Sequence, residues 1–496
     1  MRRRRLAKNT IASLTFQICT IICGFILPRL ILLFYGSEVN GLVNSITQFL
    51  QIIAFLELGV GAVVQSSLYK PLADNDIDNT SKILVSADKF FRRLARILFV
   101  YILALIVIYP YIANQNYGYL YTATLIAAMS ISSFAQYYFG VVDRLLLTAD
   151  QHGYIQYNTQ TITLLFNTLA CTALIYLGSP IQIVKLTTSL IYLLRPMYLR
   201  LYVNKHYSIN RKITYTGEPI RQKWNGVAQH VAAVVLDGTD NIVLTVFASL
   251  SDVSIYSVYH LVVYGVKQLF TSLTNGISSL MGELWAKQEL DNLHKTFGWV
   301  EWSIHTGVTF VFGCTGILIL PFVQVYTNGV TDANYVQPLF AVLITAANAL
   351  HCLRLPYNMM ILAGGHYKQT QSNYIIAAML NIVVSVITVK TWGLIGVAIG
   401  TLIAMLYQTI WMAIYDSKYL LKWPMQKFVK QIIVDVITVF LIGLATFRIT
   451  LDTITYAAWI VLAIKVAAIC LVITVIINTI FYKRHMTALL KKIIRR

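Results

Sequence analysis

The sequence predicts an all-α polytopic membrane protein that crosses the bilayer about fourteen times. Of its 496 residues, 57% are hydrophobic and only 12% are charged. The apolar residues gather in blocks of about 20, the length that a helix needs to cross a bilayer. Basic residues cluster in alternate connections between these blocks, which is typical of the cytoplasmic side of a membrane protein. Length, hydropathy and charge therefore indicate the same fold class.

The apolar blocks follow one another from one end of the chain to the other. Their approximate limits are 10–35, 41–68, 94–114, 119–141, 154–178, 181–203, 224–249, 253–284, 299–326, 335–363, 371–389, 392–415, 428–448 and 454–482. Each block is long enough for one helical span. Because the charge pattern predicts that both termini are cytoplasmic, the number of spans must be even, and fourteen satisfies this condition.

The basic connections fix the predicted orientation. Cationic side chains precede the first span, surround the second, sixth and twelfth connections, and close the chain; examples are Arg2 to Arg5, Lys82, Arg93, Arg211, Lys422 and Arg495. The odd-numbered connections carry only Lys390 and Arg448. The net charge of +19 is thus explained by contact with anionic headgroups, and nucleic-acid binding is not expected.

A short internal repeat predicts two lobes. GSEVNGLVNS (36–45) and LSDVSIYSVY (250–259) share a serine, an acid and a valine at the start of spans two and eight. Two six-helix halves would place the repeat at these positions. We therefore expect an N-lobe (1–203), a cytoplasmic linker (204–223), a C-lobe (224–415), and two further spans with a basic tail (416–496).

Enzyme signatures are missing from the sequence. It contains no phosphate loop, no GxSxG elbow and no HExxH zinc motif. The segment LADNDIDNT (72–80) alternates aspartates like the start of a calcium loop, but it lacks the glycine and glutamate of such a loop and is better explained as a helix N-cap. We expect no enzyme activity, no metal and no cofactor.

Two stretches of the chain resemble a known transporter family. LPRLILLFYGSEVNGLVNSITQFLQIIAFLELGVGAVVQSSLYKPLADND (27–76) and PYNMMILAGGHYKQTQSNYIIAAMLNIVVSVITVKTWGLIGVAIGTLIA (356–404) resemble the polysaccharide flippases, the Wzx-like branch that includes O-antigen and teichoic-acid exporters. This branch belongs to the multidrug/oligosaccharidyl-lipid/polysaccharide (MOP) superfamily. The resemblance implies a MATE-like, V-shaped pair of lobes in the bacterial cytoplasmic membrane. It also implies transport of a polyprenyl-diphosphate-linked oligosaccharide from the inner to the outer leaflet.

Charged residues within the spans are the candidate site residues, because a diphosphate needs a polar cavity to cross hydrocarbon. Asp237 and Lys267 lie 14 and 16 residues on either side of Ser251, so their depths differ by about 3 Å in a helical hairpin. We expect both to face a central cavity near mid-membrane and to pair in at least one conformational state. The alternative is a buried ion pair that only fixes the packing of the lobe.

Other charged residues within the spans are weaker candidates for the substrate site. Arg354 could receive the diphosphate or snorkel to the interface. Arg29 follows Pro28, which frees a backbone carbonyl and lets the helix bend, so Arg29 is a candidate phosphate contact, with snorkelling as the alternative. Glu57, Asp240 and His230 are candidates for ion coupling. Arg195 is interpreted as an interface anchor.

Three functional hypotheses follow. The first is a flippase for lipid-linked oligosaccharide by alternating access, and a peptidoglycan-precursor (lipid II) flippase shares its fold and charge requirements. A MATE-type drug/cation antiporter should instead favour an acidic cavity. The expected partners are the lipid-linked substrate, membrane lipids and a coupling H⁺ or Na⁺, and the protein is expected to act as a monomer.

Overall fold

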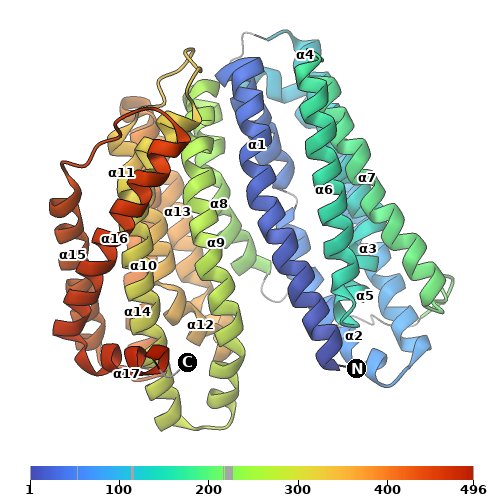
Figure 1. Cartoon of the computed structure of the whole chain (residues 1–496). Coiled ribbons are helices and arrows are strands. Elements are labelled where there is room, and N and C mark those ends of the chain that lie inside the picture. The colour runs from blue at the N-terminus through green and yellow to red at the C-terminus, as the bar shows by residue number, and fades with distance from the viewer. Residues whose placement is uncertain (1, 53, 113–116, 216, 218–226, 495–496) are drawn as a thin grey trace. The chain divides into compact units, whose positions relative to one another are not determined.

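The structure is a computed structural model that describes residues 2–52, 54–112, 117–215, 217 and 227–494. Within these ranges, the side chains of residues 2–7, 54–59, 62, 227–234, 237, 275–276, 279, 367, 490 and 492–494 are not described. The described part of the chain contains helices and no strand, which confirms the all-α prediction. Figure 1 shows the helices in chain order.

The first half of the chain forms seven α-helices and one π-helical segment. They are α1 (Arg2–Gln51), α2 (Ala54–Ala73), α3 (Ile77–Ile112), α4 (Tyr119–Ala135), the π-helix η1 (Gln136–Gly140), α5 (Val141–Ala149), α6 (Gly153–Tyr176) and α7 (Ile181–His206). Since η1 joins α4 to α5 without a break, the predicted span 119–141 belongs to a longer helical segment that ends at Ala149.

The second half forms ten α-helices and a second π-helical segment. They are α8 (Val227–Phe247), α9 (Leu250–Ala286), α10 (Leu290–Tyr326), α11 (Pro338–Leu353), α12 (Leu355–Ala363), α13 (Tyr367–Trp392), α14 (Leu394–Tyr415), the π-helix η2 (Asp416–Leu420), α15 (Met425–Thr446), α16 (Tyr456–Phe481) and α17 (Lys483–Ile494). Each apolar block predicted from the sequence thus falls on one or two helices.

Gly36 interrupts the long helix α1. Its φ of 84° and ψ of 174° are non-helical, and glycine adopts such a φ without a steric penalty. The break separates the first predicted span from the second. Backbone dihedrals stay helical at Pro28, where the sequence predicted that a bend could form. The corresponding break in the second half lies between α8 and α9, just before Leu250, so both copies of the short repeat begin a helical segment.

Nine helical segments in the described residues are long and apolar enough to cross a membrane. They include α3, α10, α15 and α16. Helices α6 and α7 lie on predicted spans but do not meet those limits of hydropathy and charge. They carry glutamine, threonine and arginine side chains within their predicted spans. The multi-pass membrane class is supported, whereas the count of fourteen spans stays a prediction.

The chain divides into two compact units. Unit 1 comprises residues 1–234 and 249–254, and unit 2 comprises residues 235–248 and 255–496. Within unit 1, α6 packs against α1 and α7, and α4 packs against α7. Tyr109 of α3 donates a hydrogen bond to Ser45 of α1 over 2.6 Å, with both side chains buried. Since an unpaired buried hydroxyl is costly, this bond favours one register between the two helices.

In unit 2, small residues bring α13 and α14 very close together. A Cβ atom on Gly400 would lie 2.1 Å from Ser385 Oγ, and one on Gly396 would lie 2.5 Å from the backbone of Thr388. Gly393, between the two helices, has a φ of 52°. Small residues at such positions let helix backbones approach closely in membranes. The Trp392–Gly396 stretch therefore forms a tight helix pair.

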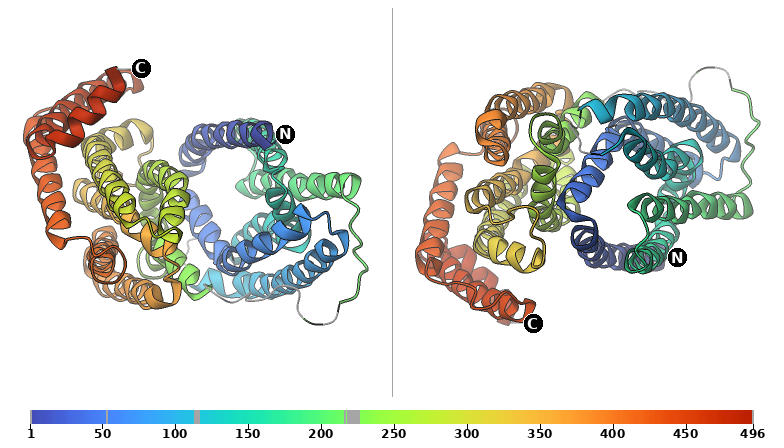
Figure 2. Two further views of the ribbon diagram at one scale, coloured as in Figure 1. Left: turned by 90° about the horizontal axis from the view of Figure 1, so that it is seen from below. Right: turned by 90° about the horizontal axis from the view of Figure 1, so that it is seen from above.

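The last helices of unit 2 pack against α10. Figure 2 shows α15, α16 and α17, coloured orange-red to red, along one flank of this unit, and α10 contacts both α15 and α16. Asn478 of α16 accepts hydrogen bonds from Trp302 (2.9 Å) and Thr306 (3.0 Å) of α10. A buried amide that accepts two such bonds fixes the position of α16 on α10.

Candidate functional site

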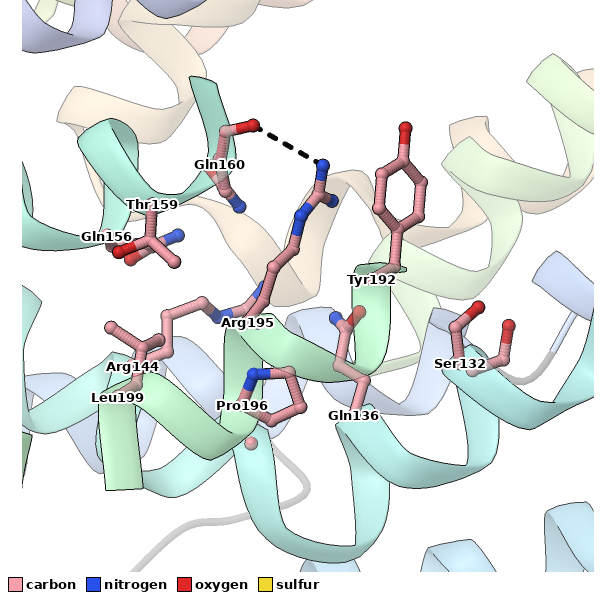
Figure 3. A pocket seen from close by; sticks show the side chains of 12 residues that line it. Ser132, Gln136, Arg144, Gln156, Thr159, Gln160, Tyr192, Arg195, Pro196 and Leu199 are labelled. Atoms are coloured by element: carbon pink, nitrogen blue, oxygen red, sulfur yellow. Dashed lines mark hydrogen bonds between the residues drawn. The ribbon is translucent and has the colours of Figure 1, made fainter. Parts of the chain in front are cut away.

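Unit 1 contains a polar cavity between the η1 region, α6 and α7. Its volume is about 230 Å³. Two arginines, Arg144 and Arg195, line it, and the other lining residues are neutral; they are Ser132, Ser133, Gln136, Gly140, Gln156, Thr159, Gln160, Tyr192, Pro196 and Leu199. Figure 3 shows these side chains. Two guanidinium groups among amide and hydroxyl groups form a suitable environment for an anion that carries hydroxyl groups.

Arg195 is held by its neighbours. Its Nε donates to Thr163 Oγ1 over 2.6 Å, its Nη2 donates to the carbonyl of Gln160 over 3.4 Å (Figure 3), and its guanidinium lies 3.6 Å from the ring centroid of Tyr192. Hydrogen bonding and cation–π contact together restrict the side chain to one direction. Such restriction lowers the entropy that is lost when an arginine binds a ligand.

Backbone irregularities shape this cavity. Pro196 lies inside α7 and has no N–H, so the carbonyl of Tyr192 loses its helical partner. Gly140, at the end of η1, packs on this proline: a Cβ there would lie 2.8 Å from Pro196 Cβ. π-Helical segments frequently occur at functional sites. Here η1 inserts an irregular turn just before Arg144.

Asp143, the neighbour of Arg144, is the acid closest to the cavity in sequence, but two other arginines bind it. Arg200 Nη1 and Arg211 Nη2 donate to its carboxylate over 3.0 Å and 2.9 Å, and its side chain is 1% exposed. Its negative charge is therefore compensated away from the cavity lining. Among the lining residues that the structure describes, two are cationic and none is acidic.

Unit 2 contains a much smaller cavity, of about 20 Å³, that brings two predicted site residues together. Asp240 and Lys267 both line it, along with Tyr256, His351 and Thr401. Both charged side chains are buried, at 4% exposure each. The sequence analysis paired Lys267 with Asp237, whose side chain lies outside the described residues, as do those of Glu57 and His230.

The carboxylate of Asp240 accepts hydrogen bonds from three helices. Thr401 Oγ1 of α14 donates over 2.7 Å, Tyr256 Oη of α9 over 2.9 Å, and Asn381 Nδ2 of α13 over 3.3 Å. The other end of this amide, Asn381 Oδ1, is buried without a hydrogen-bond donor in the described part of the chain. Asp240 is thus a buried carboxylate to which three neutral side chains donate.

Arg354 lies at the junction of α11 and α12 and is buried, at 6% exposure. Its Nη2 lies 3.1 Å from His351 Nδ1, and its Nη1 lies 3.9 Å from the sulfur of Met412. Its buried Nε has no hydrogen-bond partner among the described residues. Because His351 also lines the Asp240–Lys267 cavity, Arg354 is one residue away from that cavity.

Arg29 lies on α1, in unit 1, and is partly buried. It does not line the polar cavity of this unit. The residues that the sequence analysis missed are Arg144 and the lining glutamines. The predicted span ended at residue 141, which placed Arg144 in a connection, and no sequence pattern signalled that η1 extends this helix.

The fold of this chain is similar to those of known proteins, although no family model matches the chain and no curated protein matches its sequence. The structure is similar to the lipid II flippase MurJ in an inward closed conformation, with a TM-score of 0.73, 14% sequence identity, and coverage of 96% of this chain and 99% of that one.

The chain has the fold of the MOP transporter superfamily. A multidrug-resistance MATE transporter in an inward-facing conformation matches 83% of this chain and 98% of its own, with a TM-score of 0.62 and 14% identity. A MOP superfamily transporter from Pyrococcus furiosus matches 84% of this chain and 96% of its own, with a TM-score of 0.56 and 12% identity. These structures are transporters by name, and their similarity to this chain establishes its fold.

Proposed function

We propose that the protein is a flippase that moves a polyprenyl-diphosphate-linked oligosaccharide across the bacterial cytoplasmic membrane by alternating access. The observation that carries this proposal is the cavity of unit 1, in which Arg144 and Arg195 lie among glutamine, serine and threonine side chains, with no acid among the lining residues that the structure describes. The guanidinium groups match a diphosphate. The neutral polar groups match sugar hydroxyls, which both donate and accept hydrogen bonds.

A diphosphate that crosses the membrane must exchange its water of hydration for polar groups of the protein. A diphosphate in hydrocarbon is far too costly unless cations and hydrogen-bond donors take the place of water, whereas the polyprenyl chain is stable in lipid. Since the whole cavity holds about 230 Å³, we propose that it takes the diphosphate and the first sugar rather than an entire oligosaccharide.

A lipid II flippase is the second candidate. It is favoured by the match to MurJ, which covers 96% of this chain, whereas the MATE transporter covers 83%. A drug/cation antiporter is disfavoured because the described lining of the cavity in unit 1 carries two cations and no carboxylate, and such a lining would repel organic cations.

We propose that Asp240 takes the coupling ion, H⁺ or Na⁺. This assignment is supported by its burial and by the three side chains that donate hydrogen bonds to it. Lys267 and Arg354 are proposed to compensate the charge of Asp240 or of the substrate while unit 2 changes conformation. Arg29 is proposed as a phosphate contact outside the polar cavity.

The test is flipping in proteoliposomes of a fluorescent polyprenyl-diphosphate oligosaccharide. Arg144→Ala and Arg195→Ala should each lower the rate at least about tenfold, because each removes a charge-assisted contact. Arg93→Ala removes an exposed arginine that does not line the cavity and should leave the rate unchanged. Equal rates in all four proteins would contradict the proposal. A parallel assay with lipid II separates the two flippase functions.

A further inference from the structure

Unit 2 contains a second large cavity, remote in sequence from the residues proposed to act in transport. It is about 1030 Å³ in volume and is formed by the start of α10, the segment 422–424, the start of α15, the end of α16 and α17. A cavity of this size is at the upper end of the range for small-ligand sites. It belongs entirely to unit 2.

The cavity is strongly cationic. Five lysines and one arginine line it, namely Lys295, Lys422, Lys427, Lys430, Lys483 and Arg484. The salt bridges found among the described residues involve none of them. This concentration of positive charge is unfavourable in the absence of a counter-charge and therefore favours binding of an anion.

Among the lining residues that the structure describes, Glu301 is the only acid, and its carboxylate already accepts hydrogen bonds. It is 4% exposed, and its carboxylate accepts hydrogen bonds from Tyr357 (2.6 Å) and Trp423 (3.0 Å). One buried carboxylate that is bound by two neutral donors leaves most of the positive charge of six cations uncompensated. An anion in the cavity would compensate this charge.

Aromatic and apolar residues of the cavity indicate a lipid rather than a soluble anion. Trp299, Trp302 and Tyr482 line it, and tryptophan and tyrosine are enriched where a protein meets the headgroup layer. Ile480 and Phe481, at the end of α16, also line it and are 65% and 39% exposed. A ligand in this cavity would thus have its charged part among cations and an apolar surface next to it for acyl chains.

The short helix α17 closes one side of this cavity. His485 packs against two tryptophans of α10, with ring centroids 4.8 Å from Trp299 and 5.1 Å from Trp302. Burial and the nearby Lys430 lower the pKa of His485 below its ordinary value. Lys430, one of the cations that line the cavity, thus contributes to the lowered pKa of His485.

We propose that this cavity binds the phosphate headgroup of an anionic diacyl phospholipid at the membrane surface where these basic residues lie. The lipid is a bound partner of the transporter and is distinct from the transported substrate. Basic pockets at the cytoplasmic ends of membrane helices are suited to such headgroups. The site requires the contributions of α10, α15, α16 and α17 together.

Lipid binding can be measured by native mass spectrometry of the purified full chain titrated with phosphatidylglycerol or phosphatidylcholine. The test variant Lys295→Gln/Lys422→Gln/Lys483→Gln should bind phosphatidylglycerol about tenfold more weakly or worse. The control Lys70→Gln/Lys205→Gln/Lys212→Gln removes the same charge from exposed positions of unit 1 and should bind it as the wild type does. Phosphatidylcholine should bind weakly to all three proteins.

A competition experiment with inorganic diphosphate distinguishes a site for a phospholipid from a site for a free phosphate. Inorganic diphosphate at millimolar concentration should not displace the phospholipid, because it lacks the acyl chains. Displacement by diphosphate, equal affinity for the two phospholipids, or equal loss in the test and control variants would each overturn the proposal. If the triple variant has a lower melting temperature than the wild type, the single variant Lys422→Gln, at an exposed position of the rim, repeats the comparison.

Discussion

Arg200 of α7 donates a hydrogen bond to Asp143 of α5 over 3.0 Å, and this partly buried ion pair joins two of the helices that bound the polar cavity of unit 1. Arg211, which follows α7, donates to the other carboxylate oxygen. One acid thus binds two cations while the next residue, Arg144, lines the cavity. Arg200 and Arg211 are thus bound by Asp143, whereas Arg144 and Arg195 line the cavity.

Asp143→Ala should destabilise unit 1, because it leaves two arginines without their carboxylate. Loss of one partner of a buried pair typically costs about 3–5 kcal/mol. Arg200 and Arg211 keep 23% and 27% exposure, so we expect about 2–3 kcal/mol here. Thermal unfolding of the detergent-solubilised protein measures the effect. In a double-mutant cycle with Arg200→Gln, additive losses would show that the two residues are not coupled.

Gly140→Ala should damage both folding and transport. Its Cβ would lie 2.8 Å from Pro196 Cβ, so η1 and α7 would have to separate at the cavity, at a cost of about 1–3 kcal/mol. Gly24→Ala is the matched control, because a Cβ there meets no atom within 4 Å. Melting temperatures and flipping rates of the two variants give the comparison. A Gly140→Ala protein that behaves like Gly24→Ala would refute the close contact.

Asp240→Asn should uncouple transport from its driving ion. The amide keeps the size of the carboxylate and an acceptor for Thr401, but it removes the negative charge that a cation requires. We expect a flipping rate that no longer responds to a Na⁺ or H⁺ gradient. Asp291→Asn, at an exposed acid in the first turn of α10, should preserve the response. An unchanged response in Asp240→Asn would exclude this residue from coupling.

Asp435 of α15 should be essential for packing of the last helices. Its carboxylate accepts hydrogen bonds from Thr309 (3.0 Å) and Gln431 (3.1 Å), and it lies 2.6 Å from Nδ1 of the fully buried His305. Asp435→Leu leaves these groups unsatisfied and should cost about 2–4 kcal/mol in thermal unfolding experiments. Asp435→Asn should cost less, because its carbonyl still accepts. Equal losses in the two variants would indicate that the hydrogen bonds do not matter.

The pKa of His485 should respond to the charge of the lipid cavity. Since burial and Lys430 lower this pKa, the imidazolium form is disfavoured in the folded protein. Lys430→Gln should raise the pKa toward its ordinary value, and a bound anionic phospholipid should raise it too. An NMR titration of selectively labelled histidine, with and without phosphatidylglycerol, measures both shifts. A pKa that falls on lipid addition would contradict the placement of the headgroup in this cavity.

The positions of the helices could be predicted largely from the sequence, because hydropathy and span length act locally. Their ends could not be predicted as well. The sequence placed Arg144 outside a span, whereas in the structure η1 continues α4 into α5, which contains Arg144. A π-helical turn differs from an α-helical turn by one residue, and this difference leaves no signature in hydropathy. Similarly, α6 and α7 are more polar than ordinary spans, since their side chains line a cavity that only packing creates.

Single charges were easier to find than their partners. Asp240, Lys267 and Arg354 could be recognised as buried because a charge within an apolar block is conspicuous. Their neighbours Asn381 and Thr401 are neutral, lie more than 100 residues after Asp240 in the chain and give no such signal. The pairing of Asp237 with Lys267 stays a prediction, because the side chain of Asp237 lies outside the described residues; the described acid in the cavity of Lys267 is Asp240.

The sequence by itself determined that this is a helical membrane protein, with its basic connections and the charges inside its spans, because burial in lipid and contact with headgroups depend on local composition. Only the tertiary structure decided which charges meet. It directed Arg200 and Arg211 to Asp143, brought Arg144 and Arg195 to the lining of one cavity, and gathered six cations around α17. Electrostatic energy depends on distances between helices, and these distances are set by the packing of residues far apart in the chain.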